Sequence, residues 1–164
     1  MTAAAEAATR LRAEIDAVLA DWAYHLDHGQ LDELVELFTE DALFVSGDLE
    51  FRGRVKIKNR YLERTVVRST RHTYSGLRVS AIEGDQETVP ATPGDGPPRP
   101  IRLRAWSTWV NYAANAAPPV EDVGVYVVAD FDDVVTWCAD ERWRISERRI
   151  IPVFRDMARA PITA

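Results

Sequence analysis

Residues 22–44 read WAYHLDHGQLDELVELFTEDALF, and this stretch holds the end of one predicted helix and the whole of the next. Upstream of it, apolar residues recur at steps of three or four, the spacing of one helix face: Leu11, Ile15, Val18, Trp22 and Leu26. Gly29 is the expected stop, because glycine readily takes the left-handed conformation that follows a helix end. A second, shorter helix is predicted over residues 31–38.

Downstream of this stretch the apolar period changes. A third helix is predicted over residues 54–64, directly after Gly53. Later segments alternate or run continuously apolar, which is typical of strands, over residues 72–82, 101–112, 124–131 continuing toward 137, and 143–154. Helices followed by strands predict an α+β fold.

The length of 164 residues fits a single domain, and we expect residues 1–164 to form one. Residues 83–100 carry five prolines and three glycines without periodicity, and residues 113–122 form a second such break. Each lies between strand-like segments, so both are interpreted as hairpin loops. The first is longer than compact domains usually carry, and we expect it to be disordered or to face a partner.

The composition excludes several classes of protein. Lysine and arginine total 20 against 26 acids, for a net charge of −6, which disfavours nucleic-acid binding. The single cysteine, Cys138, excludes an internal disulfide or a cysteine-based zinc site, and three histidines leave little for any metal centre. No glycine-rich nucleotide loop is present. With no membrane span or signal peptide in the sequence, we expect a cytoplasmic protein without a metal or cofactor.

Asp27 and His72 are the strongest candidates for catalytic residues. Asp27 comes at the predicted end of the first helix, and His72 opens the first long strand. A carboxylate that binds one imidazole nitrogen fixes the tautomer and makes the other nitrogen a general base. Taken alone, Asp27 also fits a polar position in a last helical turn, and His72 fits an ordinary strand histidine. The neighbouring His25 and His28 are expected to face solvent.

A resemblance to a known family favours the chemical interpretation. Residues 22–44 resemble the opening of SnoaL-like domains in the nuclear transport factor 2-like superfamily, with an aromatic, then LD, then DxLxxLF. The similarity continues through FxG at 51–53, TRH at 70–72, LRV at 77–79 and WRIxxRR at 143–149. It implies a cone-shaped, cystatin-like α+β barrel in which N-terminal helices pack in a curved antiparallel sheet. It also implies an internal apolar pocket and a homodimer.

Enzymes of this superfamily, such as scytalone dehydratase and bile acid 7α-dehydratase, use an Asp–His pair. The resemblance therefore implies a cofactor-independent lyase or isomerase that acts on a hydrophobic, ring-containing small molecule. His72 would be the general base and Asp27 its orienting partner. Tyr24 and Arg149 are expected as polar auxiliaries; strict strand alternation favours Arg149 over Arg148. The expected pocket walls are Trp22, Phe44 and Trp106.

One position departs from the pattern of the family. Dehydratases of the superfamily often carry tyrosine where this chain has Trp22, which puts dehydration itself in doubt.

Two alternatives to an enzyme remain at this level. The stretches RHTYSGLRV at 71–79 and WRISERR at 143–149 also resemble the small β subunits of aromatic-ring-hydroxylating dioxygenases. Such a subunit packs under an iron-bearing α subunit and is not catalytic. A third interpretation is a pocketed ligand-binding or cyclase-like protein, because one fold hosts many functions.

Overall fold

The chain places its helices in the first half and most of its strands in the second. The computed structural model describes residues 2–64, 67–83, 85, 88–89 and 99–161. Its elements, in chain order, are α1 (Ala3–Asp27), α2 (Leu31–Glu36), β1 (Phe38–Ser46), β2 (Leu49–Arg52), α3 (Arg54–Leu62), β3 (Ser69–Ala81), β4 (Thr88–Val89), β5 (Arg99–Pro100), β6 (Arg102–Ala114), β7 (Val125–Trp137), β8 (Trp143–Arg155) and the 3₁₀ helix η1 (Met157–Arg159).

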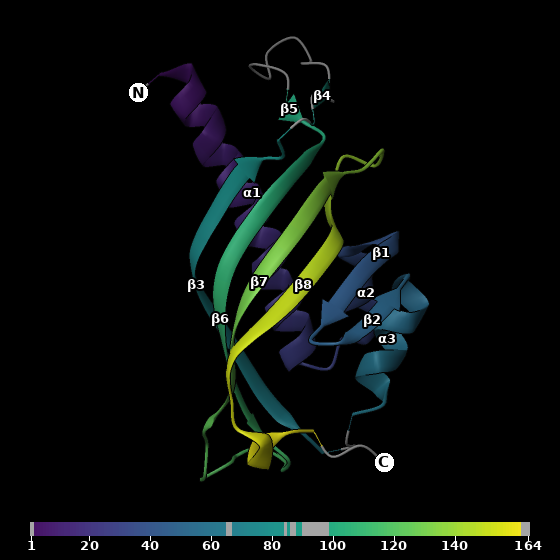
Figure 1. Cartoon of the computed structure of the whole chain (residues 1–164), viewed down its shortest axis with the longest axis vertical. Coiled ribbons are helices and arrows are strands. Elements are labelled where there is room, and N and C mark those ends of the chain that lie inside the picture. Colours follow the sequence, from purple (N-terminus) through teal and green to yellow (C-terminus); the bar gives the residue numbers. More distant parts are fainter. Residues whose placement is uncertain (1, 65–66, 84, 86–87, 90–98, 162–164) are drawn as a thin grey trace.

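A six-stranded sheet organises the molecule, with the strand order β2-β1-β8-β7-β6-β3. All neighbouring strands in it are antiparallel except β1 and β8, which are parallel. The four long strands β3, β6, β7 and β8 lie side by side, while β1, β2, α2 and α3 gather at one edge (Figure 1). The predicted α+β class and the curved-sheet architecture are confirmed, with the one parallel pair as a difference.

Extra residues inserted into the long strands bend the sheet. The β3–β6 register shifts between Ser75 and Arg78, where Gly76 has a positive φ of 65°. On β8, Ser146 and Val153 are each an extra residue against β7. Such bulges increase local twist and bend the strand that carries them. The curved sheet thereby leaves space on the side that faces α1.

Helix α1 packs along the sheet and supplies much of the core (Figure 1). Thr2 caps its first turn by accepting a hydrogen bond from the Ala5 N–H. Its buried face is close to the predicted stripe and consists of Ile15, Leu19, Trp22, Ala23 and Leu26. Gly29 follows the helix end with a φ of 70°, as expected of a helix stop. Within the described residues, no helix is long and apolar enough to cross a membrane.

The structure differs from the sequence prediction between residues 36 and 52. Helix α2 ends at Glu36, and Phe38 already begins strand β1, which the sequence did not predict. The difference arises from distant pairing, because the Leu37 carbonyl accepts the Ile145 N–H and Phe38 lies beside Ile145. Within the segment 83–100, β4 pairs with β5, which closes the segment. Residues 84, 86–87 and 90–98, on which the expected disorder or partner contact falls, lie outside the described residues.

Candidate active site

Asp27 connects the end of α1 to the beginning of β3. Its Oδ1 accepts hydrogen bonds from the Thr70 hydroxyl, at 2.7 Å, and from His72 Nδ1, at 2.6 Å. Its Oδ2 accepts the backbone N–H of His72 at 2.7 Å. A carboxylate at a helix C-terminus is unfavourable for the helix dipole. The contacts with β3 therefore account for an aspartate at this position, where helix stability alone would not.

The pair is arranged so that one nitrogen of His72 remains available as a base. Because an ionised carboxylate only accepts hydrogen bonds, the Nδ1 of His72 carries the proton and Nε2 has the free lone pair. Both side chains are 5% exposed. Nε2 has no hydrogen-bond partner among the described residues, and His72 lines a cavity. The sequence placed these residues on separate elements, and the fold brings them into direct contact.

Burial and neighbouring charges determine the protonation of the pair. Burial lowers the pKa of His72, the Asp27 hydrogen bond and charge oppose this, and the positive charges of Arg64 and Arg148 lower the pKa further. Burial alone would raise the pKa of Asp27, but the hydrogen bonds and charge of His72 more than offset it and lower that pKa. At neutral pH, His72 is therefore neutral and Asp27 ionised, as a general base requires.

The cavity beside His72 is formed by α1, α3 and five strands of the sheet. Trp22, Phe44, Trp109 and Phe131 give it an aromatic wall. Its volume is about 90 Å³, whereas one buried water needs only about 10–15 Å³. This space is therefore several times larger than the site of one buried water. Its wall includes two of the three residues expected there, Trp22 and Phe44.

Several buried polar atoms around this cavity have no hydrogen-bond partner among the described residues. They are Trp22 Nε1, Tyr61 Oη, Arg64 Nε, Asn111 Oδ1 and Arg148 Nη1. Four of these residues line the cavity itself; Arg148 lies beneath Trp22. Buried polar groups in folded proteins are nearly always paired, because an unpaired group costs about 1–3 kcal/mol. Unpaired polar groups gathered at one cavity can be satisfied by the polar atoms of a bound molecule.

Arg148, and not Arg149, is the arginine that faces the interior. Its guanidinium binds both carboxylate oxygens of Asp133, at 2.8 and 2.7 Å, and both side chains are completely buried. It also lies 4.3 Å from the centre of the Trp22 ring. The expected preference for Arg149 is corrected by the bulge at Ser146, which reverses the alternation of side chains along β8. Arg149 points outward and pairs with Glu147.

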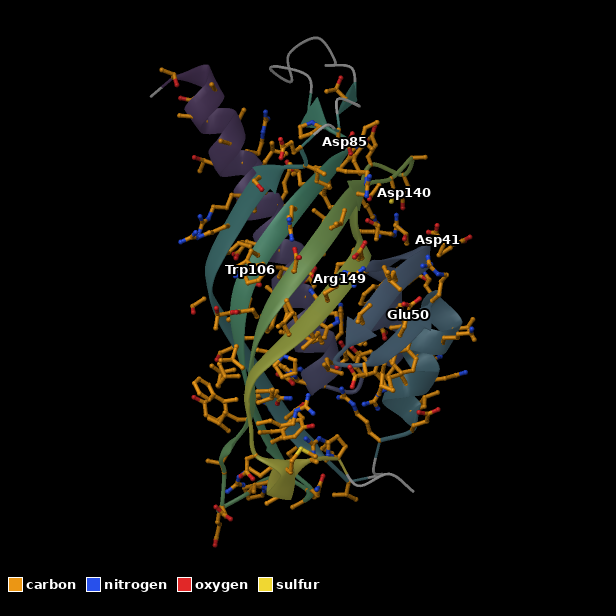
Figure 2. All side chains as sticks on the ribbon, in the orientation of Figure 1. Asp41, Glu50, Asp85, Trp106, Asp140 and Arg149 are labelled. Carbon is orange, nitrogen blue, oxygen red and sulfur yellow. The ribbon has the colours of Figure 1, made fainter. Side chains whose placement is uncertain are left out.

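The structure also places two other expected site residues away from the cavity. Tyr24 is 54% exposed on α1 and stacks on His28, so it does not reach His72. Trp106 lies on the opposite face of β6, beside Arg78 and Arg104. Trp106 and Arg149 are labelled on the face of the sheet turned away from α1 (Figure 2). Strand alternation explains the placement of Trp106, because Trp109 and Asn111 share the cavity-facing parity.

The sequence interpretation did not select Tyr61, Arg64 and Asn111 as site residues. A signal existed for Asn111, a polar residue that continues the buried parity of Leu103, Ala105, Ser107 and Trp109. Tyr61 follows Ile57 by one turn on α3 and is buried with it. Arg64 had no recognisable signal, because it follows the helix. The described residues contain no group of three or more His, Cys, Asp or Glu side chains arranged to hold a metal ion.

Comparison with known proteins places these observations in a family. A model of the SnoaL-like domain matches residues 7–92. No curated protein matches the sequence.

Solved structures share the fold at low sequence identity. ActVI-ORFA from Streptomyces coelicolor is 16% identical with a TM-score of 0.67, covering 87% of this chain and 97% of its own. A candidate scytalone dehydratase from Novosphingobium aromaticivorans is 16% identical with a TM-score of 0.71, covering 98% and 94%. The β subunit of a candidate aromatic-ring-hydroxylating dioxygenase from the same organism is 16% identical with a TM-score of 0.67, covering 95% and 99%.

Proposed function

The chain belongs to the SnoaL-like domain family, and from this premise we propose that it is a cofactor-independent lyase or isomerase with His72 as its general base. The substrate is a hydrophobic, ring-containing small molecule bound in the cavity. One observation carries the proposal: the 2.6 Å contact between His72 Nδ1 and Asp27 Oδ1 at the wall of an aromatic cavity. This contact leaves Nε2 as the base that meets the ligand.

The proposed chemistry begins with the removal of a proton from carbon. His72 Nε2 takes a proton from a C–H bond next to a carbonyl, and the electron pair of that bond moves toward the carbonyl oxygen. The adjacent Asp27 carboxylate stabilises the imidazolium that forms. In an isomerisation, the imidazolium returns the proton to a different carbon. In a dehydration, the electron pair forms a double bond, and the imidazolium protonates the departing hydroxyl so that water leaves.

Two unpaired donors in the cavity suit the negative charge that develops on oxygen. Tyr61 Oη and Trp22 Nε1 are both buried without partners in the described part of the chain. Burial raises the pKa of Tyr61, against the opposing charges of Arg64, Arg148 and Arg60 and an interaction with the neighbouring Trp22 side chain. Tyr61 therefore keeps its proton at neutral pH and can donate a hydrogen bond. A pre-positioned donor in a site that excludes water stabilises an oxyanion strongly.

A simple ring ketone tests the base. The β,γ-unsaturated cyclohexenone carries acidic hydrogens between its carbonyl and its double bond, and its conversion to the conjugated isomer is followed by ultraviolet absorbance. We expect the wild-type protein to accelerate this conversion and His72→Ala to reduce the rate by about 10²–10⁴-fold. His28→Ala is the matched control, because His28 is exposed and its side chain hydrogen-bonds the Tyr24 carbonyl and stacks on the Tyr24 ring, away from the cavity.

Two outcomes would overturn the proposal. One is equal rates for the wild type and His72→Ala, both folded by circular dichroism, and the other is a wild-type rate no faster than the buffer. Such a result would favour the non-catalytic alternatives, a dioxygenase β subunit or a ligand-binding or cyclase-like protein. The homodimer that the resemblance implies stays a prediction, and the molar mass in solution, measured by light scattering, tests it.

A further inference from the structure

Three arginines contribute to the lining of the cavity that contains His72: Arg60 on α3, Arg64 just after α3 and Arg155 at the end of β8. No acidic residue is found among the described residues of this lining. Arg60 and Arg64 are partly buried and Arg155 is exposed, so the positive charge extends from the wall to the open end. In a chain of net charge −6, this is a local reversal of sign.

These three guanidiniums differ from many other arginines of the protein in lacking a carboxylate partner. On the outer face of the sheet and in its turns, arginines pair with neighbouring acids, as in Arg104–Asp132, Arg144–Asp140 and Arg149–Glu147. Within the described residues, the side chains of Arg60, Arg64 and Arg155 form no ion pair or hydrogen bond, although their backbones take part in the local secondary structure. Arg60 and Arg64 instead lie over aromatic rings, 5.9 Å from the centre of Phe51 and 4.5 Å from that of Tyr61.

Arg64 makes the strongest case for a missing partner. Its Nε is buried and has no hydrogen-bond acceptor in the described part of the chain. Burial lowers the pKa of Arg64, yet a guanidinium stays protonated at neutral pH. Burying this cation is costly; the charge of Asp27, which is not in direct contact, offsets part of the cost, and a carboxylate bound to the guanidinium would offset more. The Arg64 guanidinium lies at the wall of the cavity, where an anion can reach it.

We propose that the cavity selects ring compounds that carry an anionic group of the carboxylate type, held by Arg64 with Arg60 and Arg155. The inference rests on the proposed function and deepens it by naming the substrate class. The ring lies against the aromatic wall formed by Trp22, Trp109 and Phe131, and the anion occupies the arginine end. With the ring and the anion held in this way, the C–H bonds of the substrate are presented to His72.

A matched pair of probes tests the selection for charge. Phenylacetate and its neutral counterpart phenylacetamide have the same ring and nearly the same shape, and their binding is measured by titration calorimetry. We expect the wild-type protein to bind phenylacetate about tenfold to a hundredfold more tightly than the amide. Arg64→Gln is expected to remove most of this preference. Arg149 is exposed on the opposite face of the sheet, so Arg149→Gln should keep the preference for phenylacetate.

The outcomes separate this inference from the proposed function. His72→Ala should retain the preference for phenylacetate, since the base is not needed for anion binding, so the inference can hold even where turnover fails. Equal affinity of the wild type for the two probes, or an unchanged preference in folded Arg64→Gln, would overturn it. Where Arg64→Gln does not fold, the exposed Arg155→Gln takes its place and should weaken the preference; an unchanged preference in folded Arg155→Gln would then contradict arginine recognition.

Discussion

Asn111 lies directly opposite His72 across strands β3 and β6, and its buried Oδ1 has no hydrogen-bond partner among the described residues. These two cross-strand neighbours differ in their hydrogen-bond partners. His72 is fixed by Asp27 on one side and available on the other. Asn111 presents an unpaired acceptor to the same cavity. An unpaired buried acceptor destabilises the free protein, so its presence points to a role in binding.

Asn111→Leu should separate stability from function. Leucine has the same branched arrangement of side-chain heavy atoms as asparagine and removes the unpaired acceptor, so the free energy of unfolding is expected to stay constant or to rise by about 1 kcal/mol. Affinity for phenylacetamide, whose amide N–H can donate a hydrogen bond to this acceptor, should fall. Urea denaturation and titration calorimetry measure the two effects. A loss of stability above about 1 kcal/mol would show that the amide is held by a stabilising contact in the free protein.

The buried pair Arg148–Asp133 is expected to be necessary for folding. Asp133→Asn leaves the Arg148 guanidinium buried without its counter-charge, which typically costs about 3–5 kcal/mol. Urea denaturation checks this value. Glu147→Gln, which breaks the neighbouring exposed pair with Arg149, is the control and should cost at most about 1 kcal/mol. Similar losses in the two variants would contradict the structural role assigned to the buried pair.

The activity should depend on pH through His72. Burial lowers the pKa of His72 in the folded protein, so the cyclohexenone rate should rise with pH, with a midpoint below the usual value of about 6.5, and then level off. Asp27→Asn removes a group that raises this pKa, so its midpoint should be lower still and its plateau reduced by about 10²–10⁴-fold. A wild-type midpoint above the usual value would contradict the assignment.

The same shift predicts the direction of a stability change. Because the folded protein binds the His72 proton less tightly than the unfolded chain, this group favours unfolding as the pH falls below about 6.5. Its contribution becomes constant below the pKa of the folded state. Denaturation curves of the wild type and His72→Gln across this range should differ in slope. Parallel curves would show that the His72 pKa is not lowered on folding.

Arg64→Gln should raise the pKa of His72, because the positive charge of Arg64 is one of the causes that lower it. Burial, the largest cause, stays in place, so the pKa should rise only part of the way toward its usual value. The proton shift of the His72 ring followed by NMR against pH measures this. Arg149→Gln is the control, since Arg149 points away from the cavity. An unchanged His72 pKa in Arg64→Gln would indicate that the two groups do not interact.

The fold class follows from local patterns in the sequence. The apolar spacing through Trp22 and Leu26 predicts α1, and Gly29 its end, because both depend on residues within one or two helical turns. The strand segments β3, β6, β7 and β8 are predicted for the same reason. Strand β1 is not, because its pairing with β8 brings together residues about a hundred positions apart in the chain.

The sequence by itself determined the order of helices and strands and presented Asp27 and His72 as candidates. Their contact, across 45 residues of chain, depends on how α1 docks on β3, which no local pattern records. The tertiary structure also decided which arginine faces inward, since one extra residue at Ser146 reverses the side chains that follow it on β8 up to the next bulge at Val153. It alone gathered Arg60, Arg64 and Arg155 around one cavity, because a pocket is assembled from elements that meet only after folding.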